Sequence, residues 1–463
     1  MSQVYAHFIG IGGAGMSGIA LVLHERGVAV TGSDLKESRY SRALTAAGVP
    51  VTIGHDASNL GDPGVVVVSS AIPERNPELV EARVRGIEVW PRARMLAELA
   101  EQRRTIAVAG THGKTSTSSM VATMLDGMGL DPTFLIGGEV DRFRTNARNG
   151  SGEHYVVEAD ESDGSFVHLD PFVSLVTNIE PDHLDHYASL DEIEATFTEF
   201  MCRTNPLGAL VVCADDERLS QLARECGRTV MTYGFSDVSD VRVIEAHREG
   251  PGHAFTVEVG DSVVRCSSSV PGIHMVLNAT GALAVAAALG LDLGRAAEAL
   301  ASFTGVRRRF DHLGTEAGVT VVDDYAHHPT EVKATLEAAS GLDYGRVWVI
   351  FQPHRYSRTS AFAREFGGAF GHADKVVLMD VYSAGETPVP GVSGKTVVNS
   401  VLEAFPRSDV AFLPHRADVV PFVTSRLRAG DLVLTMGAGD VTTLGPEILA
   451  ALSDTPESRG ARG

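Results

Sequence analysis

The sequence of 463 residues predicts an α/β protein built from three domains. In two places an apolar, strand-like run leads through a glycine-rich turn into a helix-like run, at residues 4–18 and again at residues 106–125. In the last third of the chain, apolar runs each end in polar residues or glycine, as strands of a parallel sheet do. The length itself suggests about three domains. We place them at residues 1–100, 101–309 and 310–463, with Rossmann-like folds in the first and third and a P-loop-type fold in the second.

Composition and charge exclude several classes of protein. The formal net charge is −20, from 39 basic and 59 acidic residues, which argues against nucleic acid or an anionic membrane surface as a partner. The longest apolar runs, such as residues 283–289, are too short to span a bilayer. The N-terminus carries no leader of charged and then apolar residues, so we expect a cytoplasmic protein. As a separate expectation, the protein is a monomer or a weak homodimer. The cysteines show no C-x-x-C or metal-ligand spacing and are expected to be free thiols: Cys202, Cys213, Cys226 and Cys266.

The first domain carries a glycine motif between a strand and a helix. Gly10, Gly12 and Gly15 match G-x-G-x-x-G, and Asp34 follows the next strand where a dinucleotide fold places its ribose-binding acid. The pattern suits NAD, but equally any ligand that carries a diphosphate, and a tight turn without a ligand is the remaining alternative. For Asp34 that alternative is an exposed acid at a strand end. The candidate ligand-binding residues are Gly12, Gly13, Ala14, Gly15, Met16, Ser17, Asp34, Ser69 and Ser70.

The second domain opens with a loop that predicts binding of a nucleotide triphosphate. The strand at residues 106–109 runs into a shortened version of G-x-x-x-x-G-K-[ST], which has Val108 where the standard pattern has glycine. Glycines let backbone N–H groups close on phosphate oxygens, and the helix N-terminus adds its positive dipole end. Lys114 supplies a cation for the outer phosphates and the Thr115 hydroxyl a ligand for Mg²⁺. The candidate residues are Gly110, Thr111, His112, Gly113, Lys114, Thr115 and Ser116.

Carboxylates and histidines follow two later strands of the same domain. The strand at residues 154–158 leads to Glu158 and Glu161, either of which suits a Mg²⁺ ion held beside a phosphate loop. The strand at residues 173–179 is followed by Asp182 and His183. Ligands of α/β folds bind at the carboxyl ends of strands, which favours a site over the alternative of a solvated loop.

The third domain has four strand-like runs with polar ends, which together predict a substrate-binding rim. A second glycine–lysine–threonine sequence, at residues 391–396, imitates the phosphate loop. It follows Pro388 and Pro390 without a strand, so we expect a surface turn. The polar strand ends are residues 323–329, 352–359, 382–386 and 437–440.

Over essentially its whole length the chain resembles the Mur ligases of peptidoglycan synthesis. The resemblance rests on the glycine motif at residues 10–18, the phosphate loop, and the motifs at residues 158–162, 177–183, 323–330 and 351–359. It implies that the first domain holds the UDP of a sugar nucleotide, the second binds ATP and Mg²⁺, and the third closes over both. The family's alanine-adding branch, which uses UDP-N-acetylmuramate, L-alanine and ATP, is favoured. No lysine lies between Lys114 and Lys333, so the carbamoylated lysine of several sister ligases is absent.

The resemblance also implies roles for single residues. Thr111, Lys114 and Thr115 would contact phosphate and metal, with Glu158 and His183 as neighbours of Mg²⁺. Relatives usually have asparagine where this chain has Met275, so adenine contacts fall to Asn278. Further nucleotide contacts are Arg309 and Asp324, and the catalytic and amino-acid-binding side is formed by Tyr325, His327, His354, Arg355 and Arg358.

The expected reaction passes through an acyl phosphate, because a free carboxylate is inert toward an amine. We expect His327 to act as the base, oriented by Asp323 or Asp324, while Arg355 and Arg358 brace the anionic intermediate. Domain closure would exclude water. A sister ligase that adds another amino acid or a tripeptide stays open as an alternative. An NAD-dependent dehydrogenase leaves the phosphate loop unexplained, and a regulatory nucleotide-binding protein would not need the carboxylate-rich strand ends.

Overall fold

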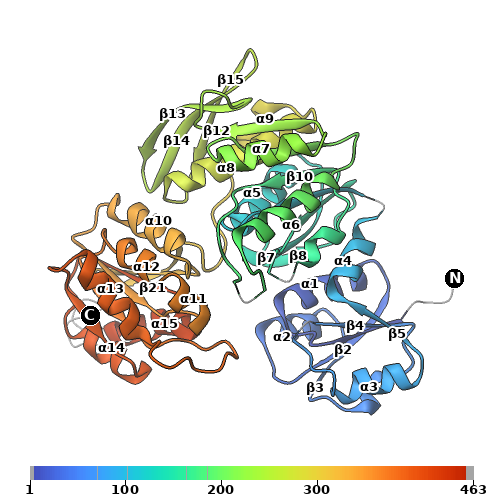
Figure 1. Ribbon diagram of the computed structural model, residues 1–463, viewed down its shortest axis with the longest axis horizontal. Helices are drawn as coiled ribbons and strands as arrows, with labels where there is room; N and C mark the ends of the chain where they lie inside the picture. Colours follow the sequence, from blue (N-terminus) through green and yellow to red (C-terminus); the bar gives the residue numbers. More distant parts are fainter. Residues whose placement is uncertain (1–4, 70, 102, 163, 185, 455–463) are drawn as a thin grey trace, which may run out of the picture.

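The computed structural model describes residues 5–69, 71–101, 103–162, 164–184 and 186–454. The chain forms three bodies, each built on a sheet of its own (Figure 1). This confirms the predicted three-part α/β fold. In the described part of the chain, no helix is long and apolar enough to cross a membrane.

The N-terminal body is a parallel sheet in the order β3-β2-β1-β4-β5. Strand β1 runs directly into the glycine turn that starts α1, so the turn lies at the carboxyl edge of the central strand. Two strands, β3 and β5, were not predicted, because each has only three or four residues and an exposed or half-buried pattern. The elements are β1 (Tyr5–Ile9), α1 (Ala14–Glu25), β2 (Ala29–Asp34), α2 (Arg39–Ala46), β3 (Val51–Ile53), β4 (Val65–Val68), α3 (Pro77–Val84), β5 (Glu88–Pro91) and α4 (Arg92–Ala100).

The central body has a ten-stranded mixed sheet in the order β15-β14-β13-β12-β11-β10-β6-β9-β7-β8. Its parallel core places β6, which carries the phosphate loop, between β10 and β9. Helix α5 is almost wholly buried because α8 and α9 pack against it. The elements are β6 (Arg104–Ala109), α5 (Lys114–Gly127), β7 (Thr133–Val140), β8 (Thr145–Arg148), β9 (His154–Glu158), β10 (Val173–Val176), α6 (Leu190–Cys202), β11 (Ala209–Cys213), α7 (Glu217–Glu225), β12 (Val230–Gly234), β13 (Val241–Glu249), β14 (Gly252–Val259), β15 (Ser262–Ser268), α8 (Ile273–Ala288) and α9 (Leu293–Leu300).

One expectation for this body is wrong. Cys202 and Cys226 form a disulfide, whereas Cys213 and Cys266 are free and buried as expected. The pair joins the C-terminal ends of α6 and α7, two helices that pack together. The 24-residue separation matches no motif, so only helix packing brings the two thiols together.

The C-terminal body is a six-stranded sheet in the order β16-β17-β21-β18-β19-β20, parallel except for β16. Hence β17, β21, β18 and β19 are neighbours, and their polar ends meet at one edge. The second glycine–lysine–threonine sequence, at residues 391–396, is a surface turn only in part, because Gly394 begins α13. The elements are β16 (Asp311–Glu316), β17 (Val319–Asp324), α10 (Pro329–Ser340), β18 (Arg346–Phe351), α11 (Tyr356–Ala361), α12 (Ala363–Ala369), β19 (Lys375–Leu378), α13 (Gly394–Ala404), β20 (Val410–Phe412), α14 (Arg416–Thr424), β21 (Asp431–Met436) and α15 (Leu444–Ser453).

Candidate active site

The phosphate loop joins β6 to α5 in a conformation that requires its glycines. Gly110 and Gly113 have φ of +129° and +81°, backbone conformations that residues with a side chain rarely adopt. A Cβ atom on Gly110 would lie 2.0 Å from the Thr177 hydroxyl oxygen. The loop is also tied to the end of β10, because His112 N–H donates to the Asn178 side-chain oxygen at 2.9 Å. The loop is therefore shaped before any ligand arrives.

Lys114 lies folded over this loop. Its Nζ donates to the carbonyl oxygens of Gly110 at 2.6 Å and Thr111 at 3.1 Å, and to Glu161 Oε1 at 2.8 Å. Burial raises the pKa of Glu161 to about 7, and its Oε2 is buried with no hydrogen-bond partner among the described residues. Burial opposes the Lys114 charge, yet Glu161 and Asp160 outweigh it and raise the lysine pKa. The ammonium group is thus held charged at the mouth of the loop.

Three expected metal neighbours gather beside Lys114. Thr115 Oγ1 donates to Glu158 Oε1 at 3.0 Å, and Glu158 Oε2 accepts from Gly137 N–H at 2.8 Å. His183 Nε2 lies 3.8 Å from Glu161 Oε1, and burial lowers the pKa of His183, which keeps its ring neutral. Hydroxyl and carboxylate oxygens next to a phosphate loop are ligands that Mg²⁺ prefers. The donor set, including the unpartnered Glu161 oxygen, fits such an ion.

One cavity of about 530 Å³ lies where the three bodies meet. It contains the phosphate loop and brings together most of the predicted catalytic residues. Its wall includes Ala14, Arg39 and Tyr40 of the first body, Lys114, Thr115, Glu158 and His183 of the second, and Tyr325, His327, His354, Arg355 and Arg358 of the third.

A smaller cavity of about 200 Å³ lies next to it and shares His112 and Gly113 of the loop in its wall. Asn278 lies in its wall, and its Nδ2 contacts Met275 Sδ at 3.8 Å. Met275 lies in the same wall, so the cavity contains Asn278, the residue expected to contact adenine, and its neighbour. Other wall residues include His112, Ser116, His274, Arg309 and Asp324.

His327 lies at the rim of the third body, but its orienting groups differ from those expected. Its Nδ1 donates to the Tyr325 carbonyl at 2.9 Å, and Glu331 Oε2 lies 3.5 Å from the same nitrogen. A carbonyl can only accept, so Nδ1 carries the hydrogen and Nε2 keeps a lone pair. Burial and Arg358 lower the pKa of His327 to about 3. In the ligand-free site His327 is therefore a neutral acceptor.

The expectation that Asp323 or Asp324 orients His327 is wrong. Asp323 accepts from Arg308 Nε at 3.1 Å and from two threonine hydroxyls. Asp324 accepts from the N–H groups of Phe310 at 2.8 Å and Ala326 at 2.7 Å. Both carboxylates thus stabilise the junction between the second and third bodies and the turn after β17. The orienting carboxylate comes from α10 instead.

The central and C-terminal bodies touch along a seam, which includes Asp182 on the central side and Arg358 and His354 on the C-terminal side. Arg358 makes a buried ion pair with Asp182, and its Nη1 donates to His354 Nδ1 at 3.2 Å. Burial and the neighbouring arginines lower the pKa of His354 to about 4. Arg355 is the N-cap residue before α11, with φ of +67°, and lines the large cavity. Of the two arginines expected to brace an anion, Arg358 therefore already binds a carboxylate.

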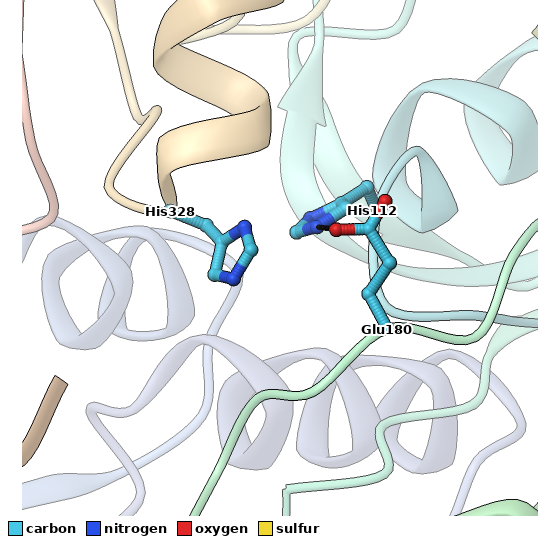
Figure 2. Close-up of side chains that lie close together, drawn as sticks. All are labelled: His112, Glu180 and His328. Atoms are coloured by element: carbon cyan, nitrogen blue, oxygen red, sulfur yellow. Dashed lines mark ion pairs between the residues drawn. The ribbon is translucent and has the colours of Figure 1, made fainter. Parts of the chain in front are cut away.

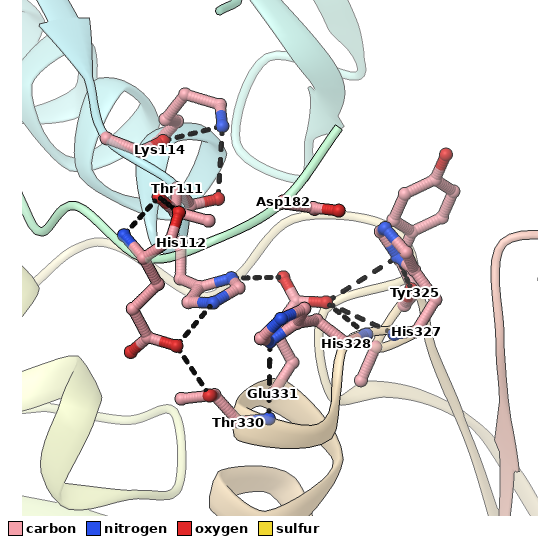
Figure 3. A network of polar contacts seen from close by, with 12 residues as sticks. Thr111, His112, Lys114, Asp182, Tyr325, His327, His328, Thr330 and Glu331 are labelled. Carbon is pink, nitrogen blue, oxygen red and sulfur yellow. Dashed lines mark hydrogen bonds and ion pairs between the residues drawn. The ribbon is translucent and has the colours of Figure 1, made fainter. Parts of the chain in front are cut away.

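Two residues of this seam, Glu180 and Glu331, were not predicted from the sequence. They flank His112: Glu180 lies 3.4 Å from its Nε2, and Glu331 lies 3.4 Å from its Nδ1. Figure 3 shows Glu331 beside His112. Burial opposes a charge on His112, but both carboxylates outweigh it and raise its pKa to about 9. Glu331 also accepts from His328 N–H at 3.3 Å at the start of α10. This His-x-x-Glu spacing is a capping-box pattern and could have revealed Glu331.

In the first body, the glycine turn is held by Asp34. Gly12 N–H donates to Asp34 Oδ2 at 2.9 Å. The Met16 and Ser17 side chains are buried, so any contact that these residues make with a diphosphate would use the main chain. Ser69 lies beside Gly10, and Ser70 is outside the described residues.

Arg92 is a further cation near this turn that the sequence did not reveal. A Cβ atom on Gly15 would lie 2.7 Å from Arg92 Nη1, and Arg92 Nη2 lies 3.7 Å from Asp160 of the central body. Arg92 therefore connects the turn with the edge of the large cavity.

The sequence matches one family over all three bodies. Residues 5–104 match the Mur ligase family catalytic domain, residues 108–286 the Mur ligase middle domain, and residues 308–439 the Mur ligase glutamate ligase domain. A UDP-N-acetylmuramate–L-alanine ligase of Rubrobacter xylanophilus is 50% identical and covers 96% of this chain and 99% of its own. A ligase of the same name from Mycobacterium marinum is 48% identical and covers 96% and 94%.

Solved structures agree with the sequence matches. The UDP-N-acetylmuramate-alanine ligase of Thermotoga maritima superposes with a TM-score of 0.81 at 30% identity, covering 96% of this chain and 98% of that chain. A murein peptide ligase of Psychrobacter arcticus gives 0.74 at 27% identity, covering 98% and 99%. Together with the phosphate loop and the shared cavity, these similarities show that the chain belongs to the Mur ligase family.

Proposed function

We propose that this chain joins L-alanine to the lactyl carboxylate of UDP-N-acetylmuramate, with ATP converted to ADP and phosphate. Relatives that are 48–50% identical over 96% of the chain carry this activity in their names. The observation that carries the proposal is a cavity to which all three bodies contribute residues. A sugar nucleotide on the glycine turn, a phosphate on the loop and an amine at the C-terminal rim can meet there. We keep the domain boundaries at residues 1–100, 101–309 and 310–463.

The first half of the reaction activates the carboxylate. Transfer of the γ-phosphoryl group of ATP gives an acyl phosphate, whose phosphate is a good leaving group. Such a transfer depends mainly on positioning and on neutralising charge. Lys114 can turn from Glu161 to the phosphate oxygens, and the N-terminus of α5 points at them. Thr115, Glu158 and His183 would hold Mg²⁺, which would offset part of the negative charge of the triphosphate.

The second half needs an acceptor for the proton of the alanine amine. His327 offers its Nε2 lone pair in the cavity, with the ring fixed through Nδ1 by Tyr325 and Glu331. The cation Arg358 helps to keep the ring a weak base in the ligand-free site, and an anionic acyl phosphate would counter that effect. Arg355 is the cation that we assign to the anionic tetrahedral intermediate. ATP and nucleotide sugars occur inside cells, so the proposal places the reaction in the cytoplasm.

Release of ADP tests the proposal. Purified protein is mixed with ATP, Mg²⁺ and UDP-N-acetylmuramate, with and without L-alanine, and the product is identified by mass. We expect release that requires both the sugar nucleotide and L-alanine. Because a murein peptide ligase also resembles the chain, the tripeptide substrate is tested in parallel. Stimulation by the tripeptide instead of L-alanine would overturn the choice of substrate and leave the fold assignment intact.

A further inference from the structure

Three side chains of types that can bind a metal lie together at the seam, and none of them belongs to the residues that we assign to Mg²⁺. They are His112 of the phosphate loop, Glu180 after β10 and His328 at the start of α10 (Figure 2). Each offers one ligand atom, and these atoms all lie within 4.8 Å of one another. The central body supplies two of the ligands and the C-terminal body the third.

One of these side chains, His328, has a buried ring nitrogen without a partner. His328 Nε2 makes no hydrogen bond within the part of the chain that the structure describes, whereas His112 Nε2 faces Glu180 Oε2 at 3.4 Å. The two rings lie 4.6 Å apart between centroids, and His328 itself is 3% exposed. Burying a polar group without a partner costs free energy, so the His328 nitrogen next to the His112–Glu180 pair calls for an explanation.

The spacing suits a tetrahedral ion. Bonds of about 2.0–2.1 Å to a tetrahedral Zn²⁺ place neighbouring ligand atoms about 3.3 Å apart. His112 Nε2 and Glu180 Oε2 are already 3.4 Å apart. The other separations, up to 4.8 Å, require an inward movement of the His328 ligand atom of at most about 1.7 Å.

The neighbouring groups also suit such an ion. Glu331 lies 3.4 Å from His112 Nδ1, an arrangement that fixes the ring of a metal-binding histidine through its other nitrogen. Thr330 N–H donates a long hydrogen bond of 3.4 Å to His328 Nδ1. Coordination through His328 Nε2 would place the ring hydrogen on Nδ1, which could then no longer accept this bond. The start of α10 would keep the bond from His328 N–H to Glu331.

We propose that His112, Glu180 and His328 bind a divalent cation of the zinc type at the seam, distinct from the Mg²⁺ of the reaction. Two imidazoles and one carboxylate favour zinc over magnesium, which prefers oxygen ligands. The ion takes the place of the proton on His112 Nε2. Because its ligands belong to two bodies, it fastens the C-terminal body to the phosphate loop.

Equilibrium binding of Zn²⁺ to the full-length, chelator-treated protein tests this site. The protein contains no nucleotide, millimolar Mg²⁺ is present throughout, and a chromophoric chelator reports free zinc. We expect one Zn²⁺ per chain, with affinity lowered at least tenfold in His328→Gln and in Glu180→Gln. Glu180 accepts from the Thr330 hydroxyl in the first turn of α10, and Glu180→Gln keeps a side-chain oxygen that can accept this bond.

Two controls separate this site from other places where zinc could bind. His415→Gln alters an exposed histidine at the start of α14 and should leave the affinity unchanged. His183→Gln removes a residue of the Mg²⁺ set and should also keep zinc binding. If His183→Gln abolishes binding while His328→Gln and Glu180→Gln keep wild-type affinity, zinc occupies the Mg²⁺ set and the proposal is wrong.

Discussion

Arg358 of the C-terminal body and Asp182 of the central body form a buried ion pair across the seam. Arg358 Nη2 lies 2.8 Å from Asp182 Oδ1 and 3.1 Å from Oδ2, and Nε lies 3.1 Å from Oδ1. Both side chains are less than one tenth exposed. The pair therefore couples closure of the third body to the strand end that carries His183.

Removing one partner of this pair should open the seam. Asp182→Asn leaves the Arg358 charge buried without a full partner, which costs about 3–5 kcal/mol. We expect a larger radius of gyration by small-angle scattering, unchanged far-ultraviolet circular dichroism, and at least tenfold slower ADP release. The control Arg218→Gln removes an exposed pair with Glu194 and should leave stability close to that of the wild type. An Asp182→Asn protein with wild-type size and turnover would show that the pair does not hold the closed arrangement.

The two glycine–lysine–threonine sequences give a matched test of the phosphate loop. Lys114→Met should lower ATP turnover by about 10³-fold, the scale for losing a preorganised charge donor. Lys395→Met changes the second glycine–lysine–threonine sequence, at the start of α13, where the lysine lies over the Phe412 ring. ATP turnover by this variant should stay at the wild-type rate. Steady-state ADP release measures both. Normal ATP turnover by Lys114→Met would remove the basis for the phosphate-loop assignment.

The role of His327 separates the two halves of the reaction. His327→Ala should slow peptide-bond formation by about 10²–10⁴-fold, because the proton acceptor is lost. Formation of the acyl phosphate should continue, and borohydride trapping of the activated carboxylate measures it. His247→Ala, on the exposed β13–β14 hairpin, is the control. Near wild-type alanine-dependent turnover in His327→Ala would reject the base role.

Acid should weaken the N-terminal body through Glu78. Burial opposes its charge, but hydrogen bonds with His7, Ser33 and Asn59 outweigh burial and lower the pKa to about 2. A carboxylate with a lowered folded-state pKa adds stability above its unfolded pKa, near 4.3, and loses it as the pH falls toward 2.

The shift corresponds to about 3 kcal/mol at neutral pH. Glu78→Gln should therefore be less stable than wild type at pH 7, and the difference should narrow between pH 5 and pH 3. Urea unfolding at several pH values measures this, with Glu98→Gln on the exposed side of α4 as control. A difference that does not change with pH would mean that the Glu78 charge contributes nothing to folding.

Sequence reasoning reached the elements whose signals are local. The run from β6 through the phosphate loop to α5, and the run from β1 to α1, each occupy a short stretch in which apolar pattern and glycine spacing act together. The polar strand ends of the third body were also predictable, because parallel strands place their carboxyl ends at one edge. The short strands β3 and β5 were missed, since three or four residues carry too little pattern.

The sequence by itself determined the fold class, the family and the phosphate loop, because neighbouring residues encode them. Tertiary structure alone decided which side chains meet at the seam. Asp182 and Arg358 are 176 residues apart, and Cys202 and Cys226 pair only because two helix ends pack together. Glu331 replaced the expected aspartates beside His327, since the turn after β17 uses the Asp324 carboxylate for backbone N–H groups. Contacts of this kind depend on how the three bodies dock, and no local pattern specifies that docking.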